Sequence, residues 1–235
     1  MNTKINNAVI LAAGRGSRLS LGLKKNNLKI LTKINNKTLI LENIKNIKKY
    51  LKVKKIFIVG GYNFKILKQF FKTNKNVTLI NNTEWKKGNG YSLDTALKYL
   101  KNNTFFLLAG DHFFSKNFYK SILNSKVKFG LACSKNLEFF HDINDATKIF
   151  SKKNIICNIG KKIKKFNGFD TGFFIINKRY LNTTKKTSIS QIIKNAKNKI
   201  KRINVNNNDW IDLDTKTDIK NFKIAIKQKI FHYGN

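Results

Sequence analysis

The sequence predicts an α/β fold in which a parallel sheet is covered by helices on both faces. Apolar, strand-like runs alternate along the chain with segments whose apolar residues have helical spacing. The run 104–109 predicts a continuous apolar strand, which is typical of parallel sheets buried on both sides. No proline- or serine-rich linker divides the 235 residues, so we expect one domain over 1–235.

The first half of the chain carries the clearer pattern. Strands are predicted at 7–13, 55–59, 77–80 and 104–109. Segment 37–51 places its apolar side chains at helical spacing, and 63–71 is also expected to be helical. A third helix is expected over 92–100, with Ser92 as a possible N-cap.

The second half is less regular and is expected to face the substrate. Strands are predicted at 129–134, 173–177 and 203–205. Segments 146–150 and 154–159 suggest a hairpin-like insertion. Helices are expected over 189–200 and 217–229, the second of which closes the chain.

The formal charge of +36 would suit a nucleic-acid-binding protein, but the rest of the composition argues against that function. Proline is absent, and lysine, asparagine, isoleucine and phenylalanine are heavily used, as expected of a strongly AT-biased genome. The lysines are dispersed along the chain, so we expect a solvated basic surface and no specific nucleic-acid partner.

Other bulk features favour a cytoplasmic location. Cys133 and Cys157 have neither metal-ligand spacing nor a disulfide framework, which suits a reducing compartment. We find no signal peptide and no apolar run of the ~18 residues that a membrane span needs. The oligomeric state is left open by the sequence.

A glycine-rich turn at 11–19, Leu-Ala-Ala-Gly-Arg-Gly-Ser-Arg-Leu, directly follows the first predicted strand. Gly14 and Gly16 allow close approach of a ligand to the backbone, whose N–H groups can hold phosphate oxygens. Arg15 and Arg18 add guanidinium groups suited to phosphate, and the chain has only two other arginines among 48 basic residues. Neither the dinucleotide pattern nor the P-loop pattern matches this turn.

Carboxylates are scarce, twelve in all, so their positions carry information. Asp111 follows the apolar strand 104–109, at the strand end where open α/β sheets bind ligands. Asp212 and Asp214 alternate on one predicted strand face, and Asp214 in particular would complete a two-carboxylate magnesium site with Asp111. Asp214 could equally begin a helix, since Thr215 and Asp218 have the spacing of a capping box.

These motifs, taken in order, resemble the nucleotidyltransferases that make activated sugars and alcohols. The matching segments are Leu11–Leu19, Lys29-Ile30-Leu31, Ile56–Tyr62, Gly110-Asp111 and Trp210–Thr215. One departure is Leu28 before Lys29, where the family usually has proline. The resemblance implies a Rossmann-like three-layer fold with a mixed, mostly parallel sheet, of the nucleotide-diphospho-sugar transferase type.

A narrower resemblance, to the CTP:inositol-1-phosphate cytidylyltransferases, rests on further segments. These are Asn82–Leu93, Gly110-Asp111-His112, Asp145–Lys148 and Phe169–Phe174. It implies a Mg²⁺-dependent transfer from CTP to myo-inositol 1-phosphate that gives CDP-inositol and pyrophosphate. Another small acceptor, such as phosphocholine, a sugar 1-phosphate or a phosphonate, is the alternative.

The resemblance also implies roles for individual residues. Nucleotide binding falls to Leu11, Ala13, Gly14, Arg15, Gly16, Ser17, Asn89 and Ser92. Arg18 and Lys29 act on the reacting phosphates, and Asp111 and Asp214 hold Mg²⁺. Lys148 and Asp170 are expected to bind the acceptor, although a surface lysine and a turn aspartate are the plain alternatives. The N-terminal half would thus bind the nucleotide and the C-terminal half the acceptor.

Two other classes of function compete with this hypothesis. A nucleic-acid-binding protein would show a localised basic stripe with interleaved aromatic residues, which the dispersed lysines do not form. An inactive regulatory homologue would be expected to have lost its phosphate-binding and metal-binding residues. The chain has kept all of these: Arg15, Arg18, Lys29, Asp111 and Asp214.

Overall fold

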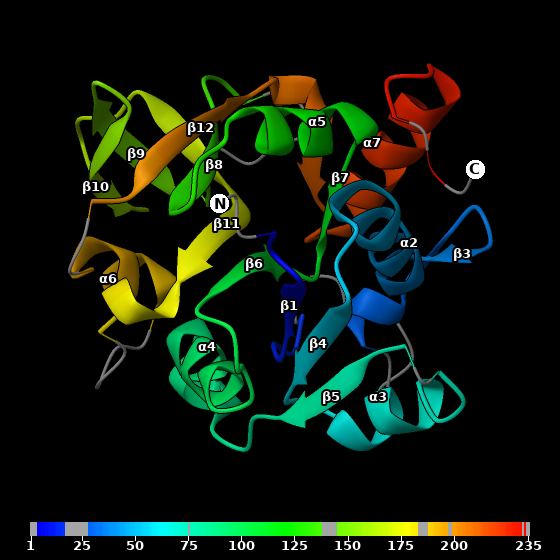
Figure 1. Ribbon diagram of the computed structural model, residues 1–235. Helices are drawn as coiled ribbons and strands as arrows, with labels where there is room; N and C mark the ends of the chain where they lie inside the picture. Colours follow the sequence, from blue (N-terminus) through cyan, green and yellow to red (C-terminus); the bar gives the residue numbers. More distant parts are fainter. Residues whose placement is uncertain are drawn as a thin grey trace.

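The computed structural model describes the chain as an α/β fold around a nine-stranded mixed sheet (Figure 1). The described residues are 4–16, 28–74, 76–137, 145–182, 188–196, 199–231 and 233. The strand order is β5-β4-β1-β6-β11-β8-β12-β10-β9. Its strands are β1 (Asn7–Ala12), β4 (Lys55–Gly60), β5 (Thr78–Asn81), β6 (Thr104–Ala109), β8 (Gly130–Ser134), β9 (Lys148–Lys152), β10 (Ile155–Gly160), β11 (Gly168–Asn177) and β12 (Lys201–Val205).

The sheet is mixed, but its description as mostly parallel holds for one half alone. Strands β5, β4, β1 and β6 run parallel to one another, whereas β11 is antiparallel to both β6 and β8, and in the other half only β8 and β12 pair in parallel among the described strands. A further antiparallel pair, β10 and β9, lies at one edge of the sheet. Strands β9 and β10 are joined by Lys153 and Asn154, both at positive φ, which makes a tight hairpin, and a hairpin pairs its strands antiparallel.

Helices cover both faces of the sheet, which gives the expected three layers. The helices are α2 (Leu39–Asn46, continued by the π-helical turn Ile47–Leu51), α3 (Phe64–Phe70), α4 (Asn89–Leu97), α5 (Lys116–Asn124), α6 (Ile189–Lys194) and α7 (Lys216–Lys227). Because strand side chains alternate, Ile10 of β1 packs in the core with α2, α3 and α5. Its neighbour Val9 packs on the other face with α4 and α6.

Several predicted boundaries are wrong for identifiable reasons. Helix α4 begins at Asn89, so Ser92 is buried inside the helix and does not cap it. Helix α6 ends at Lys194, six residues before the predicted end. The sequence analysis also missed α5, whose cap is Ser115: the Ser115 hydroxyl accepts a hydrogen bond from the Phe118 amide.

Two short ribbons and a third core bring distant parts of the chain together. Strand β7 (His112–Phe114) pairs antiparallel with β13 (Trp210–Asp212), and Asp212 lies opposite His112. Strands β2 (Lys33–Ile34) and β3 (Lys37–Thr38) form the other ribbon. Around β7 and β13, Phe113 packs with Phe222 of α7. This packing fixes the Asp212–Asp214 segment beside Asp111.

Among the helices of the described ranges, none combines the length and hydropathy of a membrane span.

Candidate functional site

Two cavities meet at the carboxyl ends of β1 and β6. The smaller, about 230 Å³, lies between the glycine turn after β1 and the short helix η1 (Lys29–Leu31). The larger, about 790 Å³, extends from the start of α4 to β11 and α7. They share the lining residues Leu11, Gly14, Asp111 and Asp214. A ligand could therefore place one part in each cavity, with Asp111 and Asp214 between them.

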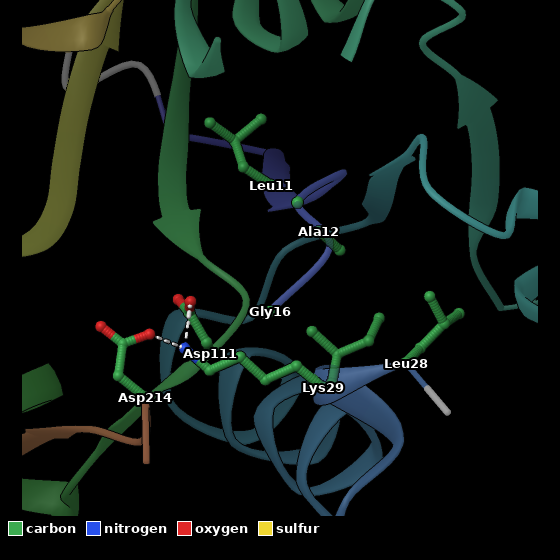
Figure 2. Close-up of a pocket in the computed structure, with 9 residues that line it drawn as sticks. Leu11, Ala12, Gly16, Leu28, Lys29, Asp111 and Asp214 are labelled. Atoms are coloured by element: carbon green, nitrogen blue, oxygen red, sulfur yellow. Dashed lines mark hydrogen bonds and ion pairs between the residues drawn. The ribbon is translucent and has the colours of Figure 1, made fainter. Parts of the chain in front are cut away.

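The ammonium group of Lys29 lies between the predicted metal ligands (Figure 2). Its Nζ donates to Asp111 Oδ2 at 2.7 Å and to Asp214 Oδ1. A third carboxylate oxygen, Asp212 Oδ1, is 3.7 Å from the same nitrogen. Lys29 is only 7% exposed, whereas the three carboxylates remain partly open to solvent on the cavity side. The sequence therefore predicted correctly that Asp111 and Asp214 meet, but not that a lysine joins them.

The local fold explains why these side chains converge. Asp111 lies two residues beyond the end of β6, and Asp214 lies two residues beyond the end of β13. The Leu213 amide donates to the Asp111 main-chain oxygen at 3.2 Å, which ties the two segments together. Lys29 reaches them from below the glycine turn. At Gly16, where φ is +63°, a Cβ atom would lie 2.7 Å from Lys29 Cβ, so glycine is required for this packing.

Burial and charge oppose each other at this cluster. Burial by itself would lower the pKa of Lys29, but the three carboxylates outweigh it and raise that pKa above its usual range. Burial, with the charge of Asp212 beside it, raises the pKa of Asp214 to about 6. Burial would also raise the pKa of Asp212, yet His112 and Lys29 hold it below its usual range. Lys29 therefore stays protonated and positively charged among the three carboxylates.

His112 links this cluster to β11. Its Nε2 lies 3.4 Å from Asp212 Oδ2, and its Nδ1 is 2.8 Å from the Thr171 main-chain oxygen. Burial would lower the pKa of His112, but Asp212, Asp111 and the Thr171 carbonyl together raise it to about 10. A doubly protonated ring donates to both neighbours. Gly172, at φ +72°, leaves room for this ring, because a Cβ atom there would overlap Nδ1.

The donor set suits a hard divalent cation. Asp111 and Asp212 each offer a carboxylate oxygen within 4.8 Å of the other, and within the described ranges no group hydrogen-bonds to the buried Asp212 Oδ1. His112 lies in the same group, but a doubly protonated ring has no lone pair for a cation. Asp214 adds a third candidate carboxylate through its contact with the same lysine as Asp111. Carboxylate oxygens beside open space for phosphate and water are the arrangement that Mg²⁺ prefers. The residues present therefore fit such an ion.

The predicted nucleotide-binding residues mostly line these cavities. Leu11, Gly14 and Gly16 line the smaller cavity, and Ala13 the larger. Arg15 is exposed, and its guanidinium lies 5.7 Å from the centre of the Tyr62 ring. Ser17 and Arg18 fall outside the residues that the structure describes.

Asn89 and Ser92 line the larger cavity at the start of α4, and each has one fixed partner. Asn89 Oδ1 accepts from the Ile189 amide at 2.9 Å, and Ser92 Oγ accepts from Asn82 Nδ2 at 3.0 Å. Each side chain uses an acceptor in this way, so the Asn89 amide nitrogen and the Ser92 hydroxyl keep a donor. This end of the cavity thus offers two hydrogen-bond donors to a planar ligand.

The two predicted acceptor-binding residues have different positions. Asp170 lines the larger cavity, and its Oδ1 accepts from the Gly172 amide at 2.7 Å. Burial raises the pKa of Asp170 to about 6. Lys148 does not line that cavity: its Nζ donates to the Lys161 main-chain oxygen at 3.2 Å and lies near the Phe166 ring. Among the described residues, two lysines do line the larger cavity: Lys86, near the start of α4, and Lys161, beside Asp145.

Sequence reasoning missed two further residues at this site. Lys161 pairs with Asp145, which also lines the cavity. Asn43 of α2 is buried and donates to the His112 main-chain oxygen at 2.8 Å. Among 44 lysines no signal separates Lys161 from Lys148, whereas a polar Asn43 inside an apolar helix face was a visible signal.

Comparison with known proteins places this geometry in context. Residues 8–133 match the model of the MobA-like NTP transferase domain. A curated relative from Aquifex aeolicus, a bifunctional IPC transferase and DIPP synthase, is 32% identical over 93% of this chain and 51% of its own length. A second from Archaeoglobus fulgidus, with the same name, is 30% identical over 95% of this chain and 44% of its own. The chain therefore spans about half the length of these relatives.

Solved structures show the same fold. The inositol-1-phosphate CTP transferase from T. maritima superposes with a TM-score of 0.82 and 23% identity, over 98% of both chains. The CTP:phosphocholine cytidylyltransferase from Streptococcus pneumoniae superposes with a TM-score of 0.71 and 20% identity, over 94% of this chain and 100% of that one. Both confirm the nucleotide-diphospho-sugar transferase type of fold. With the family model matching more than half of its residues, the chain belongs to the MobA-like NTP transferase domain family.

Proposed function

We propose that this chain is a Mg²⁺-dependent cytidylyltransferase that converts CTP and myo-inositol 1-phosphate to CDP-inositol and pyrophosphate. The observation that carries the proposal is the meeting of Asp111, Asp214 and Lys29 under the glycine turn, where two cavities join. The choice of substrates is supported by the curated relatives named as IPC transferases and by the segments that resemble cytidylyltransferases. CTP supply would place the reaction in the cytoplasm.

The chemistry is a single displacement at phosphorus. A phosphate oxygen of the acceptor forms a bond to the α-phosphorus of CTP while the bond from that phosphorus to the α,β-bridging oxygen breaks, and pyrophosphate leaves with that electron pair. Such a step depends on positioning and charge neutralisation rather than on a protein nucleophile. Mg²⁺ bound by Asp111 and Asp214 would supply charge neutralisation at the phosphate oxygens.

The residues of the chain would divide the substrates between the two cavities. The turn with Gly14, Arg15 and Gly16 would hold the leaving phosphates through its backbone amides, and we propose that Ser17 and Arg18, the next residues in the sequence, assist. Lys29 would neutralise charge on the reacting phosphates. Positioning of the triphosphate in this way aligns the scissile bond with the incoming phosphate oxygen.

The donors at the start of α4 favour cytosine. Cytosine presents two adjacent acceptors, N3 and O2, which match the Asn89 amide nitrogen and the Ser92 hydroxyl. Uracil and thymine carry N3–H at that position, so one donor would face another donor. Where the unpaired donor is the buried Ser92 hydroxyl, this mismatch costs about 1–3 kcal/mol.

The acceptor would lie in the C-terminal part of the larger cavity. Asp170 can accept hydrogen bonds from ring hydroxyls, and Lys161 offers an ammonium group to the acceptor phosphate. We assign the phosphate to Lys161 in place of Lys148, because the Lys148 ammonium is held at the Lys161 carbonyl away from the cavity.

A substrate panel tests the proposal. Purified protein is given each of the four nucleoside triphosphates with inositol 1-phosphate, phosphocholine, a sugar 1-phosphate or a phosphonate, and pyrophosphate release is measured. We expect release with CTP and inositol 1-phosphate above all other pairs. Release with CTP and phosphocholine but not with inositol 1-phosphate would overturn the acceptor assignment and keep the cytidylyl transfer. No release with any pair would overturn both.

A further inference from the structure

We propose that Lys29 is an internal counter-ion that occupies the metal position of the free protein, so that the divalent cation enters only as the nucleotide phosphates draw the lysine away. The observation is the double contact of one buried ammonium with Asp111 and Asp214, the two carboxylates assigned to the metal. The inference depends on the proposed function solely for the identity of the phosphates.

Charge balance makes the lysine necessary in the free protein. Three carboxylates, those of Asp111, Asp212 and Asp214, lie within 4 Å of Lys29 Nζ. Like charges this close and partly buried repel one another strongly unless a cation lies among them. His112 supplies one positive charge beside Asp212, and the Lys29 ammonium supplies the one between Asp111 and Asp214, which keeps these two carboxylates together before any ligand arrives.

The same position is where a divalent cation must bind. A cation bridging Asp111 and Asp214 needs the oxygens that now face Lys29 Nζ. The ammonium and the cation therefore compete for one place, and binding of the cation alone leaves the buried Lys29 charge with only Asp212 of its three carboxylates. The loss of two partners by a buried charge is the cost that weakens metal binding to the nucleotide-free protein.

Phosphate oxygens remove this cost. The smaller cavity lies directly beside Lys29 and is lined by Gly14 and Gly16 of the glycine turn. A triphosphate there offers the ammonium new anionic partners while it brings its own cation to the carboxylates. Metal and nucleotide thus bind with positive coupling, and by linkage each raises the affinity for the other by the same factor.

Mn²⁺ binding to the nucleotide-free protein tests the exchange. Mn²⁺ is titrated into the wild type, Lys29→Met and Lys33→Met, and free Mn²⁺ is followed by electron paramagnetic resonance. Lys33 is an exposed lysine four residues along the chain and serves as the matched control. We expect Lys29→Met to bind Mn²⁺ about tenfold or more tightly than the wild type, and Lys33→Met to match the wild type. Equal or weaker Mn²⁺ binding by Lys29→Met overturns the inference.

A measurement on the wild type keeps the inference testable if Lys29→Met fails to fold. The ¹⁵N resonance of the Lys29 ammonium, assigned through its side-chain contacts with Gly16, is followed by NMR. We expect little change with millimolar Mg²⁺ alone and a clear shift when Mg²⁺ is added with α,β-methylene-CTP. A full shift with Mg²⁺ alone would show that the cation displaces Lys29 without phosphate, against the inference.

These readouts separate the inference from the proposed function, since neither needs turnover. If the wild type releases pyrophosphate from CTP but Lys29→Met gains no Mn²⁺ affinity, the proposed function is supported and the exchange of Lys29 for the cation is wrong. If Lys29→Met gains Mn²⁺ affinity but the wild type releases pyrophosphate with no substrate pair, the exchange is supported and the proposed function is wrong.

Discussion

The side-chain amide of Asn43 donates a hydrogen bond to the main-chain oxygen of His112 at 2.8 Å, across 69 residues of sequence. The same nitrogen lies 3.5 Å from the Gly110 main-chain oxygen. Asp111 is the residue between these two carbonyl groups. One buried amide on α2 therefore holds both ends of the turn that carries a candidate metal ligand.

Replacement of Asn43 by leucine tests this support. The Gly110 and His112 carbonyl groups would lose a buried donor, which we expect to lower the free energy of unfolding by about 1–3 kcal/mol. Without the hydrogen bonds from Asn43, the turn that carries Asp111 is held less firmly in place, so we also expect weaker Mn²⁺ binding. Urea unfolding and Mn²⁺ titration measure the two effects. Asn46→Leu, on the same helix and half-buried, is the control, and equal behaviour of the two variants would show that Asn43 is an ordinary core residue.

Gly172→Ala tests the fit between β11 and His112. A methyl group at residue 172 would overlap the His112 imidazole. The alanine would also have to adopt a φ near +72°, which residues other than glycine rarely do. We expect His112 to move from Asp212 and the free energy of unfolding to fall by about 1–3 kcal/mol. Thermal unfolding and the histidine NMR resonances report these changes. Gly14→Ala, with open space around the position and no positive φ, should leave stability nearly unchanged.

Loss of either metal-facing carboxylate should abolish turnover while the fold persists. Asp111→Asn and Asp214→Asn each remove a charged ligand, and we expect kcat to fall by a factor on the order of 10³. Circular dichroism and pyrophosphate release are measured together. Asp94→Asn on α4, a residue that lines neither cavity, should keep normal turnover. Normal turnover in Asp111→Asn would show that Asp111 is not a ligand of the catalytic metal.

Asp170 should make stability depend on pH. Burial raises its pKa to about 6 in the folded protein, against 3.8 for an ordinary aspartate, so the folded state holds a proton more tightly than the unfolded state. The penalty for the buried charge is therefore small below about pH 4, grows as pH rises from about 4 to 6, and stays constant above that. We expect Asp170→Asn to raise the free energy of unfolding by on the order of 1–2 kcal/mol at pH 7.5.

The control for this prediction is the same pair of proteins at pH 4, where they should unfold at nearly the same urea concentration. A gain of stability in Asp170→Asn that is equal at both pH values would show that packing, rather than charge, separates the variants.

The parts of the fold that follow from local pattern could be predicted, and the parts that follow from tertiary pairing could not. Strands β1, β4 and β6 were found because each is a short apolar run between turn residues. Strand β7 was missed, since three residues that pair with β13 across nearly a hundred positions leave no local periodicity. Ser92 was placed at a helix start because its hydroxyl suits a cap, yet it lies inside α4, where Asn82 supplies its partner.

The same division applies to the candidate site. Asp111 and Asp214 could be found because each follows a strand and acids are rare in this chain. The role of Lys29 as their shared partner could not, since a spacing of 82 residues to Asp111 and 185 to Asp214 holds no periodic signal. Lys161 was hidden in the same way, because composition alone gives every surface lysine the same meaning.

The contrast between Lys161 and Lys148 gives the last test. Both are lysines of the β9–β10 region, but only Lys161 lines the larger cavity, where Asp145 pairs with it. An ammonium that binds the acceptor phosphate contributes to acceptor affinity before the chemical step, so its loss should raise KM for the acceptor more than it lowers kcat.

We therefore expect Lys161→Met to raise the KM for inositol 1-phosphate about tenfold or more, with the KM for CTP nearly unchanged. Lys148→Met is the matched control and should leave both constants close to those of the wild type. Steady-state pyrophosphate release at varied acceptor concentration measures both variants. A larger effect in Lys148→Met would show that Lys148, not Lys161, binds the acceptor phosphate. The Lys148 ammonium would then have to leave the Lys161 carbonyl and turn toward the cavity.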